Sequence, residues 1–124
     1  MYTLDTNAII YYVKDDPRAV PILQGILISD TTPLYVSTIT EAELFGFSSL
    51  TDSEATMIND LLRGVSLIPV DSHIARTAGR IRATYRLKLA DSIIAATTLF
   101  TGSTLLTRNT RDFKKVPTLS VQAL

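Results

Sequence analysis

The sequence predicts an α/β fold in which helices flank a central, mainly parallel sheet. Short strand-like runs alternate along the chain with longer helical patterns, as expected when each helix connects two parallel strands. Hydrophobic residues make up 46% of the 124 residues and charged residues 19%, a composition that supports one core and argues against disorder. No linker, repeat or low-complexity segment interrupts the chain, so we expect residues 1–124 to form a single domain.

Five short runs have the composition and length of strands. They cover residues 1–5, 34–37, 66–70, 104–107 and 118–121. Pro69 has no backbone N–H to donate to a neighbouring strand, so the third run is expected to lie at a sheet edge or to end there.

Six segments between these runs carry the signals of helices. The predicted helices begin at Thr6, near Pro17, after Thr38, after Thr51, at Ser72 and at Leu89. Two pairs, Thr38 with Glu41 and Thr51 with Glu54, have the spacing of a capping box. Asp71 is a typical N-cap residue, and Gly102 is expected to end the last helix.

Several classes of active site are excluded by composition. There is no cysteine, so thiolate nucleophiles, cysteine zinc sites and disulfides are absent. The single histidine, His73, is expected at the surface, and no Gly-x-Ser-x-Gly elbow or phosphate-binding glycine loop occurs. An enzyme with this sequence has to work mainly with carboxylates, hydroxyls, amides and basic side chains.

The sequence also lacks targeting and membrane signals. No run approaches the ~18–20 apolar residues that a membrane span needs. The first residues have no basic region and no small-residue cleavage site. We therefore expect a soluble cytoplasmic protein without membrane contact.

Charge is distributed unevenly although the formal net charge is zero. Residues 1–71 hold ten acidic and three basic side chains, whereas residues 72–124 hold nine basic and two acidic ones. This segregation is compatible with ordinary solvated surfaces. It also suits a polyanion that meets a basic rim around an acidic centre.

The carboxylates Asp5 and Asp91 stand out by position. Asp5 follows the first predicted strand, where ligands of open α/β sheets bind, although its residue type and position taken alone favour a cap of the next helix. Asp91 lies early in an almost wholly apolar helix and is expected to be partly buried. Because an unpaired buried carboxylate is costly, Asp91 calls for a partner such as a metal ion.

Two further positions leave alternatives open. Glu41 and Glu43 both lie on the helix after the second strand, and periodicity does not separate them as candidates. Asn109 and Asp112 follow the fourth strand, where they either form a turn or contribute to a site at the strand end.

Four segments together resemble the PIN-domain family, particularly the VapC-type toxins of prokaryotic toxin–antitoxin pairs. A single motif of this kind has little specificity, whereas four in the family's order, covering essentially the whole chain, are fairly specific. The segments are Leu4-Asp5-Thr6-Asn7, the run from Ser37 to Gly46, Leu89-Ala90-Asp91 with Ile94-Ala95-Ala96, and the run from Leu106 to Phe113 with Val116 to Leu119.

The resemblance implies a three-layer α/β/α fold and a metal-dependent endoribonuclease. It implies that Asp5, Glu43 and Asp91 form the acidic metal site, which favours Glu43 over Glu41. Either Asp112 or Asn109 is expected to complete the site. The expected supporting donors are Thr6, Asn7, Ser37, Thr107 and Asn109. The expected ion is Mg²⁺ or Mn²⁺, since these ions prefer oxygen ligands.

Basic residues near the third and fourth motifs are candidates for RNA phosphate contacts. These candidates are Arg86, Lys88, Arg108 and Arg111. Single-stranded or loop RNA, with tRNA and mRNA as candidate classes, is favoured over duplex because unstacked strands expose their scissile bonds. If the resemblance to toxins holds, a cognate antitoxin would bind the domain, and homodimerisation would be common.

Three other functions remain open from the sequence. One is a PIN-fold RNA-binding module with weak or no activity, which the neutral Asn109 allows. Another is a phosphohydrolase with Asp5 as nucleophile, although the usual partner acid two residues on is here Asn7. A third is a nuclease that cleaves DNA.

Overall fold

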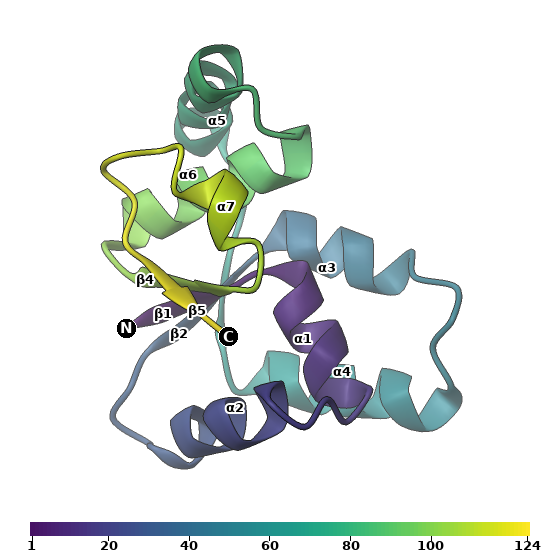
Figure 1. Cartoon of the computed structure of the whole chain (residues 1–124). Coiled ribbons are helices and arrows are strands. Elements are labelled where there is room, and N and C mark those ends of the chain that lie inside the picture. Colours follow the sequence, from purple (N-terminus) through teal and green to yellow (C-terminus); the bar gives the residue numbers. More distant parts are fainter.

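A computed structural model describes all 124 residues and has the alternating order expected from the sequence (Figure 1). The strands are β1 (Tyr2–Leu4), β2 (Leu34–Ser37), β3 (Ser66–Ile68), β4 (Thr104–Thr107) and β5 (Val121–Ala123). The helices are α1 (Thr6–Val13), α2 (Ala19–Ile28), α3 (Thr38–Phe45), α4 (Asp52–Arg63), α5 (Ser72–Tyr85), α6 (Leu89–Thr101) and α7 (Thr110–Phe113). None of the helices combines the length and the apolar composition that crossing a membrane requires.

The five strands form one parallel sheet in the order β3-β2-β1-β4-β5. The central strand β1 pairs with β2 on one side and with β4 on the other, where Tyr2 lies opposite Thr104. The chain therefore builds one half of the sheet outward from β1 and then returns to start the other half at β4. The strand order changes direction between β1 and β4, which is where open α/β sheets bind ligands.

Helices cover both faces of the sheet, so the predicted three-layer arrangement is confirmed (Figure 1). Helices α1, α2 and α4 pack on one face around a core that includes Leu4 and Leu106. Helices α5, α6 and α7 pack on the other face around a second core that includes Leu105 and Phe113. Adjacent residues of β4 thus enter opposite cores, because successive side chains of a strand point to opposite faces.

Several boundaries differ from the expected ones. Helix α2 begins at Ala19, two residues after Pro17, because the Asp16 carboxylate accepts hydrogen bonds from the backbone N–H groups of Arg18 and Ala19. The last strand lies at Val121–Ala123 and not at 118–121, and the four-residue helix α7 was not expected. Strand β3 ends before Pro69 and lies at the sheet edge, as expected.

One of the two predicted capping boxes is wrong. Ser37, one residue earlier, caps α3 by accepting a hydrogen bond from the Ile39 N–H. The Thr38 hydroxyl instead accepts from the N–H of Val70. Glu41 therefore has no capping function. The other box, Thr51 with Glu54, is present with both of its hydrogen bonds.

Candidate active site

The predicted site residues gather at the carboxyl ends of the two strands between which the sheet changes direction. Asp5 follows the last residue of β1, and Thr107 is the last residue of β4. The chain leaves β1 toward α1 and leaves β4 toward α7, so the two connections diverge to opposite faces of the sheet (Figure 1). Such a divergence opens a crevice above the strand ends.

Asp5 is 5% exposed, and both of its carboxylate oxygens accept a hydrogen bond. Oδ1 accepts from the backbone N–H of Ala8 at 2.7 Å, which caps α1. Oδ2 accepts from the Thr107 hydroxyl at 2.5 Å, across a separation of 102 residues. The capping role weighed from the sequence is therefore present, and the same carboxylate also faces the strand end of β4.

The environment of Asp5 favours the protonated acid when no cation is near. Burial raises the pKa of Asp5 from an ordinary 3.8 to about 6, even though the hydrogen bonds from Thr107 and Ala8 lower it. The negative charges of Asp91 and Glu43 raise it further. The three carboxylates, at the N-cap of α1 and on α3 and α6, therefore lie within range of one another's charge.

Glu43 is exposed on α3 and is oriented by a residue from α1. The Thr6 hydroxyl donates to Glu43 Oε1 at 2.5 Å and lies 3.2 Å from the hydroxyl of the buried Thr40. Glu41 has no hydrogen bond of its side chain. Thr40 was missed by the sequence reasoning, because nothing local distinguishes it from the other threonines of the segment.

Asp91 lies in the first turn of α6 and is half-buried, as expected. Burial raises its pKa, the charges of Glu43 and Asp112 raise it further, and Lys88 lowers it. The structure has no hydrogen bond or ion pair to the Asp91 carboxylate, in contrast to Asp5. Both of its oxygens are therefore free to bind a ligand.

Asn109 and Asp112 form one unit at the start of α7. The Asn109 side-chain amide donates to Asp112 Oδ2 at 3.1 Å, and its backbone N–H donates to the Thr107 hydroxyl at 2.9 Å. The amide of Asn109 and the ammonium of Lys115 hold the pKa of Asp112 below its ordinary value. Asp112 therefore supplies the charge at this corner, and Asn109 orients it.

The remaining two expected donors differ in their surroundings. Ser37 is fully buried and caps α3, so it fixes the start of the helix that carries Glu43. Asn7 is exposed, and its side chain makes no hydrogen bond within the protein. Ser37 supports the site through the backbone, whereas Asn7 is free to contact a ligand.

The donor set suits a hard divalent cation that keeps part of its water shell. No three Asp, Glu or His side chains lie close enough together to hold an ion by themselves. Mg²⁺ usually binds one or two carboxylates directly and retains several waters, so a closed protein cage is not required. The buried Asp5 and the unpartnered Asp91, with two more carboxylates within range of their charge, fit such a site.

Three of the four predicted RNA-binding residues have free cationic groups. Arg86, Lys88 and Arg111 are exposed, and none takes part in the four ion pairs of the structure. Arg108 differs, because its guanidinium is half-buried and pairs with Asp16. This geometry does not favour contact between Arg108 and RNA, since each of its three nitrogens already donates a hydrogen bond within the protein.

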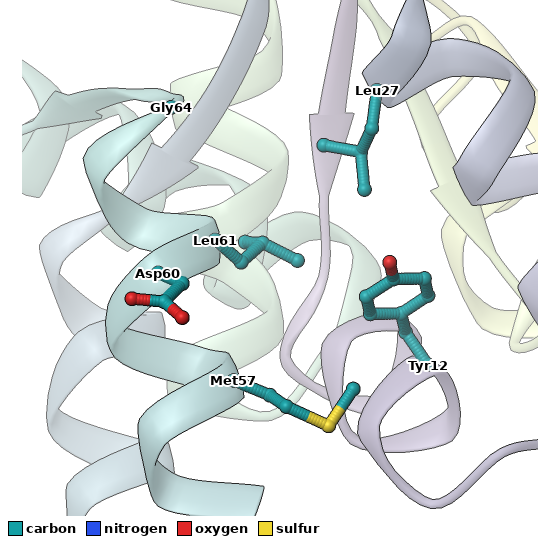
Figure 2. Close-up of a pocket in the computed structure, with 6 residues that line it drawn as sticks. All are labelled: Tyr12, Leu27, Met57, Asp60, Leu61 and Gly64. Atoms are coloured by element: carbon teal, nitrogen blue, oxygen red, sulfur yellow. The ribbon is translucent and has the colours of Figure 1, made fainter.

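A hollow in the surface is lined by none of the four candidate carboxylates, Asp5, Glu43, Asp91 and Asp112. It has a volume of about 350 Å³ and lies between α1, α2 and α4. Its lining is mainly apolar, with Tyr12, Leu27, Met57 and Leu61 pointing toward one another (Figure 2). The acidic residue in the lining, Asp60, has no second acidic residue beside it, so the hollow lacks the groups for phosphodiester chemistry.

Comparison with known proteins relates the chain to one family both by sequence and by fold. Residues 2–119 match the PIN domain family. The chain is 28% identical over 124 residues to Ribonuclease VapC19 of Mycobacterium tuberculosis, with 96% of this chain and 97% of the relative covered.

Solved structures with the same fold include a toxin–antitoxin complex from Klebsiella pneumoniae, with a TM-score of 0.81, 28% identity and coverage of 98% of this chain and 96% of that one. VapBC2 from Rickettsia felis, bound to a DNA fragment from its promoter, has a TM-score of 0.81 at 22% identity, with 99% and 98% covered, which is a likeness of fold alone. The family match spans nearly the whole chain and includes all the carboxylates described above, and the chain therefore belongs to the PIN domain family.

Proposed function

We propose that this protein is a Mg²⁺-dependent endoribonuclease, the toxin of a toxin–antitoxin pair, with residues 1–124 acting as one nuclease domain in the cytoplasm. The observation that carries the proposal is the buried Asp5 carboxylate, fixed by Thr107 and surrounded by the charges of Glu43 and Asp91. The similarity to a ribonuclease over almost the full length supports RNA as the substrate.

The carboxylates divide into ligands and an orienting acid. Asp5 and Asp91 are the direct metal ligands, since one is held rigidly and the other has no internal partner. Asp112 completes the acidic site beside Asp91. Glu43, held by Thr6 on the exposed side, would hold the ion through water or orient the water that attacks the phosphorus.

A bound Mg²⁺ or Mn²⁺ supplies the charge that stabilises the phosphoryl oxygens and lowers the pKa of a bound water. The protein's own contribution is to keep the carboxylates close together in spite of their repulsion. Thr6 and Thr107 do so by donating to Glu43 and Asp5, which fixes the oxygen atoms before any ion arrives.

Exposed cations near the site bind the RNA backbone. Lys88 and Arg86 precede Asp91 on the connection between α5 and α6, and Arg111 lies next to Asp112 on α7. Contacts of this kind are largely independent of sequence and weaken as salt increases. The substrate is a single-stranded or loop region of RNA, because its scissile bonds can enter a crevice lined by carboxylates.

The partner of the toxin is an antitoxin protein, as in the toxin–antitoxin complex from Klebsiella pneumoniae that shares the fold. The apolar hollow between α1, α2 and α4 offers a surface for an apolar segment of that partner (Figure 2). Homodimerisation, which the resemblance also implies, is a separate prediction that sedimentation equilibrium of the isolated chain tests.

Cleavage of labelled cellular RNA tests the proposal. We expect discrete products with Mg²⁺ or Mn²⁺, none with EDTA, and none from Asp5→Asn or Asp91→Asn at equal concentration. Glu41→Gln is a matched control, because it removes an acid from the same region without a contact to the site. Cleavage that persists in EDTA or in both Asn variants would contradict the proposed site.

A further inference from the structure

Arg108 joins the end of β4 to a distant loop and to the C-terminal segment, and each of the three nitrogens of its side chain donates a hydrogen bond. Its two terminal nitrogens both donate to the Asp16 carboxylate, one of them at 2.8 Å from Oδ2. Its Nε donates to the backbone carbonyl of Leu124 at 3.3 Å. The guanidinium carbon lies 4.1 Å from the centre of the Tyr11 ring. One side chain thus binds the α1–α2 loop, the C-terminal segment and helix α1.

Asp16 is a firm anchor for this arginine. Its Oδ1 also accepts from the backbone N–H groups of Arg18 and Ala19 at the start of α2. The Arg108 guanidinium and these backbone donors hold the pKa of Asp16 well below its ordinary value. The pair in turn raises the pKa of Arg108, so both groups stay charged over the physiological pH range. A bidentate arginine–carboxylate pair of this kind restricts the orientation of the two side chains more than a lysine–carboxylate pair does.

The residues on either side of Arg108 are those that hold the acidic site. Thr107 donates its hydroxyl to Asp5, and its backbone carbonyl accepts from the N–H of Leu124. Asn109 donates its N–H to the Thr107 hydroxyl and its side-chain amide to Asp112. A shift of the backbone at 108 therefore moves the donors to two carboxylates at once.

We propose that Arg108, clamped by Asp16 and Tyr11, is a positioning residue that sets the Thr107–Asn109 segment so that Thr107 and Asn109 orient Asp5 and Asp112. The inference rests on the proposed nuclease function of those carboxylates. It assigns Arg108 to the interior support of the site and not to the RNA-binding surface. Supporting residues around metal sites typically contribute 10–100-fold to affinity or activity.

The first test compares Arg108→Gln, Arg108→Lys and Asp16→Asn with the unmodified chain. We expect kcat for RNA cleavage to fall ~10–100-fold in Arg108→Gln and Asp16→Asn, with KM changed less than about 3-fold. Arg108→Lys should retain more of kcat than Arg108→Gln but less than the unmodified chain, because lysine cannot form a bidentate pair with a carboxylate. The double variant Arg108→Gln/Asp16→Asn should be no worse than either single one, as expected for two residues that act as a pair.

The ion pair between Lys14 and Glu54 provides a matched control. It joins the end of α1 to α4 at 2.8 Å, spans 40 residues in sequence and touches no residue of the site. Lys14→Met should lower the midpoint of thermal unfolding about as much as Arg108→Gln does. It should leave kcat within about 2-fold of the unmodified chain. Equal losses of kcat in Lys14→Met and Arg108→Gln would overturn the proposal, since general destabilisation would then explain both.

Two further readouts separate the proposal from its alternatives. If Arg108 contacts RNA instead, Arg108→Gln raises KM at constant kcat and reduces the salt dependence of binding by about one charge, which overturns the proposal. Independently of cleavage, Arg108→Gln should weaken Mn²⁺ binding ~10-fold or more and shift the amide NMR signals of Ala8 and Asn109. If Arg108→Gln leaves the Mn²⁺ affinity and the amide signals unchanged, the positioning role of Arg108 is overturned, even when the chain cleaves no RNA. If both change in a chain that cleaves no RNA, the positioning role stands and only the nuclease function is refuted.

Discussion

The two ends of helix α1 differ in almost every physical respect. At its start, Asp5 accepts hydrogen bonds from α1 and β4, Thr6 donates one to Glu43 of α3, and the groups are polar and charged. Near its end, Tyr12 lines an apolar hollow with side chains of α2 and α4 (Figure 2). The comparison teaches that one two-turn helix separates bond cleavage from the surface proposed for partner binding, so each is open to change without the other.

The largest effect is expected for Asp5→Asn at the polar end. Cleavage should fall more than ~1000-fold, because the substitution removes the charge of a proposed metal ligand. The metal-free protein should nevertheless become more stable at pH 7. The pKa of Asp5 is raised from 3.8 to about 6 in the folded state, so the folded protein loses stability as the pH rises through about 6.

The upper limit of this gain follows from the difference between 3.8 and about 6, which corresponds to roughly 3 kcal/mol. The measured gain should be smaller, because an Asn oxygen can accept from only one of the donors Ala8 and Thr107. Urea unfolding in EDTA measures it. A variant that is less stable than the unmodified chain at pH 7, and equally so at pH 4, would show that Asp5 is primarily a capping residue.

The second effect distinguishes the two glutamates of α3. Glu43→Gln should reduce kcat ~100-fold, because Glu43 is held by Thr6 and lies near enough to Asp91 to raise its pKa. Glu41→Gln should change kcat less than 2-fold. Steady-state cleavage of a defined RNA measures both, and similar losses in the two variants would contradict the assignment.

The third effect concerns the apolar end of α1. Met57→Glu places a charge in the hollow, where Met57 is 38% exposed, so antitoxin binding should weaken ~10-fold or more while cleavage stays within about 2-fold. Asn59→Glu adds the same charge to an exposed position of α4 outside the hollow and should leave both unchanged. Titration of cleavage with the antitoxin gives the two affinities. Normal inhibition of the Met57 variant would place the partner elsewhere.

The smallest effect is a dependence of metal binding on pH. Because a cation competes with the proton on Asp5, Mn²⁺ affinity should rise up to ~10-fold per pH unit below about 6 and level off above it. Calorimetric titrations between pH 5 and pH 8 measure the dependence. Asp5→Asn should bind more weakly and with a flatter pH profile; identical slopes in both proteins would assign the competing proton to another group.

The fold and most of the site are accessible from the sequence because their signals are local. The alternation of strands and helices, the residue at each strand end and the position of Asp91 in an apolar helix all lie within a few neighbouring residues. Local spacing also misleads, since Thr38 and Glu41 have the pattern of a capping box while Ser37 makes the cap. Helix α7, with four residues, is too short to show a period.

Contacts between distant segments were not accessible in this way. Nothing local to Arg108 indicates that it pairs with Asp16, 92 residues away in the sequence. The choice between capping and catalysis at Asp5 was also undecidable, because the second hydrogen bond comes from Thr107, 102 residues away. Both contacts form only when the complete fold brings distant segments together, so they cannot be inferred from neighbouring residues in one sequence.

The pairing of β1 with β4 has a consequence for the order in which the parts of the proposed site are made during translation. Asp5 is synthesised about a hundred residues before the strand beside it and the hydroxyl that fixes it. At ~5–20 residues per second, several seconds of translation separate the two. A chain interrupted before residue 104 therefore carries Asp5, Glu43 and Asp91 without the β4 support of the proposed site, so the site cannot be complete until β4 has been made.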